Sequence, residues 1–253
     1  MLKWILILVM FVPTAWGYRL TTDFLNGFYW ASLPISITVV DADVTRKTLM
    51  ESFSKKAIVE WQERTGLNLW TFQPSPNQGA TLSSNTIRWS TNFAEETRMD
   101  PVSVLAVAIR YTEGPYFSRT EIVVNGNHYL NQDNANLLTT ITHELGHTMG
   151  LDHSDNMAAV MAPTLQSPYR GLDGDDVQGM EFAQDESHTR QITNYVSPLA
   201  YEKKASSGGP ISCGTITVAG AGTPSLNGPI SLGMGLLLGF ARKIFKWLKR
   251  LLS

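Results

Sequence analysis

Three histidines and one glutamate between residues 143 and 153 constrain this chain more than any other feature. His143 and His147 are four residues apart, so on an α-helix they project from one face about 40° apart, as two ligands of one tetrahedral zinc ion do. Gly150 lets the chain leave the helix through a left-handed residue, and the reversed segment returns His153 as a third imidazole. The full segment is His143-Glu144-Leu145-Gly146-His147-Thr148-Met149-Gly150-Leu151-Asp152-His153.

Glu144 is rotated away from the direction of the metal ligands and can reach a metal-bound water. The fourth coordination position stays open, which distinguishes a catalytic from a structural zinc site, because the ion must hold and acidify a water. The segment therefore predicts a zinc hydrolase in which Glu144 is the general base. The alternative is a helix with two solvent-facing histidines, and the number of fixed identities in so short a segment argues against it.

The segment matches the long zinc signature of the metzincin peptidases, H-E-x-x-H-x-x-G-x-x-H, at every fixed position. Asp152 and Ser154, on either side of the third histidine, resemble the matrixin branch, which includes the matrix metalloproteases and smaller bacterial relatives. Val160-Met161-Ala162-Pro163 lies where metzincins have their Met-turn. The resemblance therefore places Met161 beneath the imidazoles, with Met157 as the second candidate. It implies an α+β, zincin-like catalytic domain with a twisted mixed sheet, an active-site helix and a C-terminal helix.

Residues 172–180 resemble the start of the matrixin C-terminal helix, with its paired aspartates. From the residues alone, Asp173, Asp175 and Asp176 are a helix N-cap and an acidic first turn. The resemblance adds a role in structural support for Asp175 and Asp176. One of the pair braces the Met-turn in matrixins, and the other can receive the ammonium group of a trimmed N-terminus.

The pattern between residues 28 and 184 alternates between strands and helices. Residues 35–39 alternate as a strand does. A helix is expected from an N-cap at Thr45 to Thr65, with Gly66 as its stop and an apolar core stripe from Leu49 to Trp61. The other expected elements are strands at 69–72, 86–89, 104–111 and 121–124, a turn at Gly114-Pro115, and the zinc helix at 135–149, capped by Asp133 or Asn134.

By the same resemblance, the strand around Leu105, Ala106 and Val107 is the edge of the sheet above the active-site cleft. An exposed edge can pair main chain to main chain with an extended peptide, so affinity comes from backbone hydrogen bonds and selectivity from side-chain pockets. We therefore expect these three residues to bind substrate. An ordinary buried strand is the alternative.

Two departures from the animal matrixins affect metal binding and latency. Their structural zinc needs additional histidines, and between Trp89 and His143 only His128 is available. We expect one catalytic Zn2+, no structural zinc, and His128 and His188 at the surface. The acidic, carbonyl-rich loops leave Ca2+ binding open, although no segment matches a calcium loop of fixed spacing. Latency by a propeptide cysteine is not expected, because residues 18–29 contain no cysteine, and we do not expect Cys213 to replace it.

The charge is distributed unevenly along the chain. Residues 1–202 carry 13 basic and 22 acidic side chains, a formal charge of −9, whereas residues 203–253 carry seven basic side chains and no acidic ones. The acidic body argues against nucleic acid as a partner. The basic tail indicates an anionic membrane surface instead.

Residues 1–17 have the layout of a secretory signal peptide. Lys3 is the positive n-region, residues 4–12 form an apolar stretch too short to span a bilayer, and Ala15 and Gly17 are the small residues that a signal peptidase requires. We expect cleavage before Tyr18 and a location outside the cell or in its envelope; a retained N-terminal anchor is the alternative. In that oxidising compartment the only cysteine, Cys213, cannot pair within the chain, so the fold must depend on its core and its metal.

After residue 184 the composition shifts to Ser, Thr, Gly and Pro, which predicts a flexible linker at 185–229. An apolar run from 230 to 240 and a basic segment from 241 to 253 follow. This layout resembles bacterial C-terminal sorting signals. The same residues also predict a basic amphipathic helix that lies on a membrane, and a purely structural tail is a third alternative.

Four regions follow from these patterns: a signal peptide at 1–17, a matrixin-like catalytic domain at 18–184, a linker at 185–229, and a tail at 230–253 for sorting or membrane association. The expected function is a secreted or envelope-attached zinc endopeptidase that hydrolyses extended protein or peptide substrates. A zinc hydrolase of another bond is one alternative. An adhesion or membrane-perturbing protein with a structural zinc site is the other, and the intact Glu144 argues against it.

Overall fold

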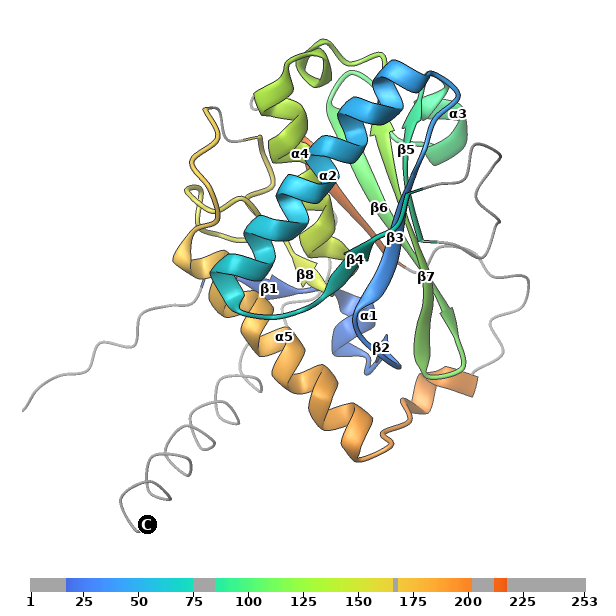
Figure 1. Cartoon of the computed structure of the whole chain (residues 1–253). Coiled ribbons are helices and arrows are strands. Elements are labelled where there is room, and N and C mark those ends of the chain that lie inside the picture. The colour runs from blue at the N-terminus through green and yellow to red at the C-terminus, as the bar shows by residue number, and fades with distance from the viewer. Residues whose placement is uncertain (1–16, 75–84, 166–167, 202–211, 218–253) are drawn as a thin grey trace, which may run out of the picture. The chain divides into compact units, whose positions relative to one another are not determined.

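The computed structural model describes residues 17–74, 85–165, 168–201 and 212–217 (Figure 1). Residues 1–16 of the predicted signal peptide and the whole predicted tail at 230–253 lie outside the described residues. In the part of the chain that is described, no helix is both long and apolar enough to cross a membrane.

A mixed sheet forms the centre of the domain, in the strand order β4-β3-β5-β7-β6-β9. The strands β3, β4, β5 and β7 are parallel to one another, whereas β6 is antiparallel to β7. This arrangement confirms the predicted α+β class with a mixed sheet. The strand bounds are β3 (Ile35–Val40), β4 (Trp70–Phe72), β5 (Asn85–Ser90), β6 (Val104–Glu113), β7 (Tyr116–Asn125) and β9 (Ser212–Thr217), and the short β2 (Tyr29–Trp30) pairs with β7.

The helix α2 (Val44–Thr65) confirms the predicted element and its stop at Gly66, which has a φ of 69°. The predicted cap at Thr45 is wrong, because the carboxylate of Asp43 accepts a hydrogen bond from the backbone N–H of Arg46 at 2.8 Å. The apolar stripe also begins one residue later than expected. Leu49 is 37% exposed, whereas Met50 is fully buried.

The hairpin of β6 and β7 contains the longest strands of the sheet. Its turn at Gly114-Pro115 was predicted, and Gly114 has a φ of 56°. The strand β7 begins at Tyr116, five residues before its predicted start, because cross-strand pairing continues to the turn, where Glu113 pairs with Tyr116. Backbone pairing thus extends the strand beyond the residues that show a strand pattern.

The prediction that β6 lies at the sheet edge is wrong for this structure. The strand β9 pairs antiparallel with β6 and takes the outer position. Leu105, Ala106 and Val107 are fully buried. Strand addition depends on main-chain donors and acceptors, so a segment that the composition assigned to a linker can form a strand where an edge is available.

The predicted start of the linker at residue 185 is also wrong. Helix α5 (Gly174–Ile192) continues past it, and the short 3-10 helix η2 (Pro198–Tyr201) follows. The last turn of α5 is held by tertiary hydrogen bonds: Arg190 donates to the carbonyl of Phe24 and Gln191 donates to that of Trp30, each at 2.8 Å. These contacts with the N-terminal segment stabilise a stretch of helix that composition alone does not predict.

The helices α2 and α4 (Asn134–Thr148) pack on one face of the sheet, and α5 contacts α2 at the end where β1 (Arg19–Leu20) and β8 (Leu151–Asp152) lie (Figure 1). Their apolar side chains and those of the sheet form one continuous core, which includes Trp61, Trp70 and Ile141. A second, smaller cluster around Val107 includes Phe93 of the short helix α3 (Phe93–Thr97). The zinc helix is therefore enclosed between a sheet and another helix.

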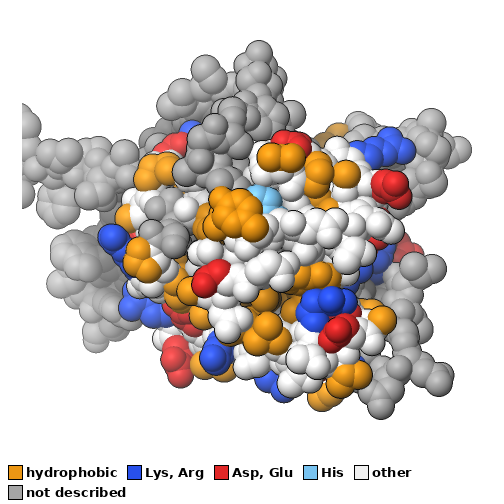
Figure 2. Space-filling model, turned by 90° about the horizontal axis from the view of Figure 1, so that it is seen from above, with side chains coloured by type: hydrophobic (Ala, Val, Ile, Leu, Met, Phe, Trp, Pro, Cys, Tyr) orange, Lys and Arg blue, Asp and Glu red, His pale blue; other side chains and the backbone are white. Residues whose placement is uncertain are grey.

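On the face seen in Figure 2, hydrophobic side chains lie among charged and polar ones, and they do not form one continuous apolar area. Exposed large hydrophobic residues of the domain come from different elements; examples are Val44, Val102 and Tyr129.

The predicted surface position of His128 is wrong. Its side chain is buried, Nε2–H donates to the carbonyl of Val102 at 3.0 Å, and Nδ1 accepts from the N–H of Leu130 at 3.2 Å.

Candidate metal centre

Helix α4 positions the first two histidines and the glutamate. It begins after Asp133, whose carboxylate accepts from the backbone N–H groups of Ala135 and Asn136 at 2.9 and 3.0 Å. Of the two predicted caps, Asp133 is therefore the one used. Leu137, Ile141 and Leu145 anchor the helix in the core. The ligand face turns toward the chain reversal that follows the helix, where the carbonyls of Val160 and Leu151 contact the imidazoles.

Gly150 makes that reversal possible. Its φ is 98°, and a Cβ at this position would lie 2.5 Å from the ring of Phe24. The chain then enters β8 (Leu151–Asp152), which pairs antiparallel with β1 (Arg19–Leu20). Pairing with the N-terminal segment holds the returning chain in place, and His153 follows directly. Glycine is needed here for both its backbone conformation and its lack of a side chain.

The three imidazoles lie together, with their possible ligand nitrogens all within 4.8 Å of one another. Nδ1 of His143 lies 2.6 Å from the carbonyl oxygen of Val160, and Nδ1 of His147 lies 2.8 Å from that of Leu151. A carbonyl oxygen only accepts, so Nδ1 carries the proton in both rings and Nε2 keeps its lone pair. The two Nε2 atoms face each other at 2.9 Å. Such carbonyl contacts are how metal-binding histidines are oriented in proteins.

This donor set fits Zn2+. Two Zn–N bonds of about 2.0–2.1 Å at the tetrahedral angle separate their nitrogens by about 3.3 Å, so the imidazoles need only small movements to share one ion. Burial lowers the pKa of His147 well below its usual value, and the neighbouring imidazoles of His143 and His153 lower it further. The neutral ring is the form that binds a metal. Among the described residues, these histidines are the one cluster of metal-binding side chains of this size.

Glu144 lies on the same helix between the two histidine ligands and is fully buried. The adjoining turn of α4 carries Gly146, on which a Cβ would collide with Sδ of Met161. Met161 is 1% exposed, whereas Met157, the second candidate from the sequence, is 53% exposed. The structure thus places Met161, and not Met157, against the zinc helix.

Asp176 holds the turn that contains Met161. Its carboxylate accepts from the backbone N–H groups of Val160 and Met161 at 2.8 and 2.9 Å, and from that of Asp173 at 2.8 Å. Asp173 and Asp176 also form a capping box at the start of α5. Burial raises the pKa of Asp176 to about 6, against the opposing effect of these N–H donors. One carboxylate therefore joins the first turn of α5 to the segment below the histidines.

Asp175 contacts the N-terminal segment instead. Its Oδ1 accepts from the backbone N–H groups of Gly17 and Tyr18 at 2.8 and 2.9 Å, and its Oδ2 accepts from the hydroxyl of Ser154 at 2.5 Å. Ser154 directly follows the third histidine. The two neighbouring aspartates thus have different partners, one in the Met-turn and the other at the start of the described chain.

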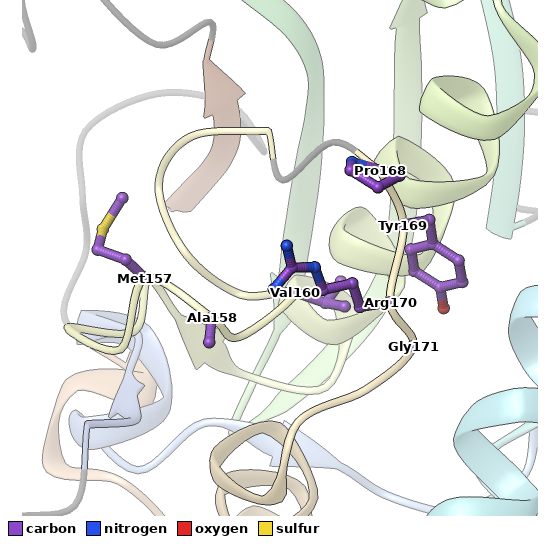
Figure 3. Close-up of a pocket in the computed structure, with 7 residues that line it drawn as sticks. All are labelled: Met157, Ala158, Val160, Pro168, Tyr169, Arg170 and Gly171. Atoms are coloured by element: carbon purple, nitrogen blue, oxygen red, sulfur yellow. The ribbon is translucent and has the colours of Figure 1, made fainter.

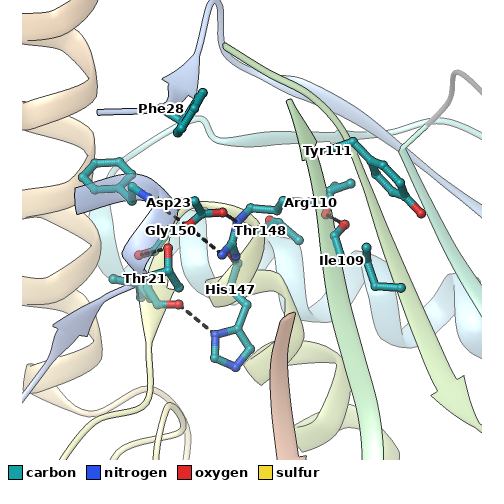
Figure 4. A network of polar contacts seen from close by, with 12 residues as sticks. Thr21, Asp23, Phe28, Ile109, Arg110, Tyr111, His147, Thr148 and Gly150 are labelled. Atoms are coloured by element: carbon teal, nitrogen blue, oxygen red, sulfur yellow. Dashed lines mark hydrogen bonds and ion pairs between the residues drawn. The ribbon is translucent and has the colours of Figure 1, made fainter. Parts of the chain in front are cut away.

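A buried ion pair that the sequence did not indicate supports the end of the zinc helix (Figure 4). Arg110 on β6 donates to Asp23 at 2.8 and 3.0 Å, and its third nitrogen donates to the carbonyl of His147. Nearby, the hydroxyl of Thr21 donates to the carbonyl of Gly150 at 3.2 Å. These bonds add partners for one carbonyl in the last turn of the helix and for one in the reversal that follows it. The only feature of the sequence that could have indicated this ion pair was a single arginine after six apolar strand residues.

Three buried tryptophans also donate to α4. Trp61 donates to the carbonyl of Thr142 at 3.0 Å, and Trp30 donates to that of Thr148 at 2.9 Å. Trp70 donates to the Thr148 hydroxyl at 3.0 Å. The tryptophans come from three different segments, so they fix the position of the zinc helix relative to the sheet and to α2.

A cavity of about 180 Å³ lies between the Met-turn segment and the chain that leads to α5 (Figure 3). The side chain of Met157 points away from the other residues of its wall in this view. Tyr169 from the same wall donates to the carboxylate of Glu60 on α2, which ties the segment to the core. The wall consists of Met157, Ala158, Val160, Pro168, Tyr169, Arg170 and Gly171.

A mixed sheet that supports a helix with two buried histidines and a glutamate, next to a third histidine, defines a zinc metalloendopeptidase. The family model of the matrixins matches residues 30–183, which is more than half of the chain. The chain belongs to the matrixin family, as the resemblance predicted. The predicted enzyme class and its use of zinc are thereby confirmed.

Proposed function

We propose that this matrixin is exported and cleaves extended segments of protein substrates outside the cytoplasm. The observation that carries the proposal is the position of Glu144, His143 and His147 on α4, which packs directly against the long strand β6 and lies next to the third histidine, His153. A peptide that runs along a strand next to this helix would bring successive carbonyl groups to the catalytic side chains.

When bound, Zn2+ supplies Lewis acidity, which polarises the scissile carbonyl and acidifies the attacking water. His143, His147 and His153 would hold the ion, two of them oriented by the carbonyls of Val160 and Leu151. Glu144 takes the proton from the attacking water and delivers it to the leaving amine. Its burial excludes bulk solvent, which strengthens electrostatic interactions at the reacting atoms.

Substrate binding is proposed for the backbone of Leu105, Ala106 and Val107 on β6. These residues are followed along the strand by Arg110, which bonds to the carbonyl of the ligand residue His147. The strand and the metal centre are therefore held in a fixed relation. Main-chain pairing would give affinity for any extended segment, with selectivity left to side-chain pockets.

Export is supported by the surroundings of Tyr18. Cleavage before this residue would place the new ammonium group at the backbone nitrogen that lies 2.9 Å from Oδ1 of Asp175. A charge-assisted bond of that kind is stronger than the amide bond it replaces. Removal of the signal peptide would thus exchange the amide bonds of Gly17 and Tyr18 for one charge-assisted bond at Asp175, next to Ser154. Peptide mapping of the protein from its native host should find Tyr18 as the first residue; an N-terminus upstream of Gly17 would contradict cleavage here.

Association with the cell envelope through residues 230–253 is proposed from the sequence. A sorting signal would be removed, whereas an amphipathic basic helix would remain and bind anionic vesicles in a salt-sensitive way. Intact mass and C-terminal mapping of the native protein separate these outcomes. Ca2+ binding by the acidic loops remains a proposal as well, and a rise in the unfolding temperature on adding Ca2+ would support it.

Cleavage of a diverse peptide library by the zinc-loaded protein tests the proposal as a whole. We expect internal cuts in extended peptides, with one zinc per chain. The matched control is Glu144→Ala, which keeps the histidines but removes the general base. Equal cleavage by both forms, or hydrolysis limited to bonds other than peptide bonds, would contradict the proposed function.

A further inference from the structure

The strand β9 lies where a substrate of this enzyme would be expected to bind. It runs antiparallel to β6 along the stretch proposed to pair with peptide, and Figure 1 shows it as the orange-red strand beside β6. The paired residues are Val104 with Thr217, Ala106 with Ile216, Val107 with Thr215, Ala108 with Gly214, Ile109 with Cys213 and Arg110 with Ser212.

The same strand also contacts the zinc helix. Close approaches of β9 in the described part of the chain are concentrated on β6 and α4. In Figure 4 it lies next to β6, on the side of the His147 imidazole. His143, Glu144 and His147 are all fully buried in this arrangement. The structure is therefore a closed state, in which a strand of the chain itself occupies the position along β6 that an incoming peptide would take.

We propose that residues 212–217 act as an internal competitor for the substrate position, so that the chain holds its own C-terminal strand as a pseudosubstrate. This inference rests on the proposed role of β6 as the substrate-binding strand. Because β9 belongs to the same chain as β6, its effective concentration at β6 is high, on the order of millimolar for segments joined by a short linker. Release of β9 requires the loss of its contacts with β6 and α4.

Competition of this kind has a specific kinetic signature. Only the fraction of the enzyme in which β9 has been released from β6, the open fraction, binds peptide. The apparent KM is therefore multiplied by the reciprocal of that fraction. The kcat of the open enzyme is unchanged, because β9 is absent from the enzyme–substrate complex. A change that weakens β9 pairing should therefore lower KM and leave kcat unaltered, which damage to the fold would not do.

Two proline variants of the zinc-loaded full chain provide the test. Successive residues of a strand direct their N–H groups to opposite sides. One of the variants Gly214→Pro and Thr215→Pro therefore removes a backbone hydrogen bond to β6, whereas the other removes an N–H group that points away from β6. Proline on the outer side of an edge strand is tolerated. We expect one variant to lower KM by about tenfold, the size of one or two backbone hydrogen bonds, at unchanged kcat, and the other to resemble the parent.

Hydrogen exchange of residues 104–110 gives a second readout that does not require activity. The variant with the lower KM should exchange these amides faster, whereas its partner variant should keep them protected. Equal KM values for both variants and the parent, with unchanged exchange, would overturn the proposal. No hydrolysis by any form would refute the proposed function and the inhibition together, while exchange would still report whether β9 pairs.

Cys213 provides a control for a different mechanism. A thiol could inhibit by binding the metal, without any contribution from strand pairing. We expect Cys213→Ser to retain the high KM of the parent, because main-chain bonds do not depend on the side chain. If Cys213→Ser lowers KM as much as the effective proline variant does, the inhibition belongs to the thiol and the strand proposal fails.

Discussion

Breaking the buried ion pair between Arg110 and Asp23 should destabilise the domain far more than breaking an exposed one. Both side chains are 0% exposed, and Nε and Nη2 of Arg110 lie 2.8 and 3.0 Å from the carboxylate. Asp23→Asn leaves the guanidinium buried without a counter-charge, which costs about 3–5 kcal/mol. That is a large part of the roughly 5–15 kcal/mol that stabilises a typical domain.

A double-mutant cycle separates the pair from its surroundings. Arg110→Met removes the charge but also the hydrogen bond to the carbonyl of His147, so it should cost a similar amount. The variant with both substitutions contains no uncompensated charge. It should therefore lose less than the sum of the single losses, with a coupling of about 2–3 kcal/mol.

Equilibrium unfolding in urea, with the zinc concentration held constant, measures these free energies. The matched control is Arg19→Met, because Arg19 forms an ion pair with Asp155 whose side chains are 61% and 63% exposed. That substitution should change the free energy of unfolding by less than about 1 kcal/mol. The reasoning is refuted if Asp23→Asn costs no more than the control, or if the single losses add up to that of the double variant.

Three further predictions concern the site. Glu144→Gln should keep about one zinc per chain while peptide hydrolysis falls by about 10²- to 10⁴-fold; near-parental activity would exclude the general-base role. Gly150→Ala should lower the unfolding temperature more than Gly66→Ala. Both glycines have positive φ, but only at Gly150 does a Cβ meet a neighbour, the ring of Phe24 at 2.5 Å. Equal decreases in unfolding temperature would show that the Phe24 ring moves aside at no cost. Asp176→Asn should alter the pH dependence of stability. Because burial raises the pKa of Asp176 from 3.8 to about 6, its contribution is present below pH 3.8 and lost as the pH rises through 6. The advantage of the parent over the Asn variant should therefore shrink by about 3 kcal/mol between pH 3 and 7, and a constant difference would contradict the shift.

The metal centre could be predicted from the sequence because its parts are local. Two ligands lie one helical turn apart, and the third follows within one reversal whose glycine needs a positive φ. Helix geometry and the conformational range of glycine are properties of short segments, so His143, His147 and His153 were brought together as expected. The helix cap at Asp133 and the helix stop at Gly66 could be predicted for the same reason.

Contacts between distant segments were decided only by the tertiary structure. No local pattern shows that Asp23 meets Arg110, that Asp176 holds the Met-turn while Asp175 holds the N-terminal segment, or that residues 212–217 cover β6. Main-chain hydrogen bonds between strands are the same for every sequence, so composition assigned β9 to a linker. Buried charges are placed by the partners that fold around them. The sequence by itself determined which chemistry the chain performs, and the tertiary structure decided which segments position that chemistry and which one pairs with β6.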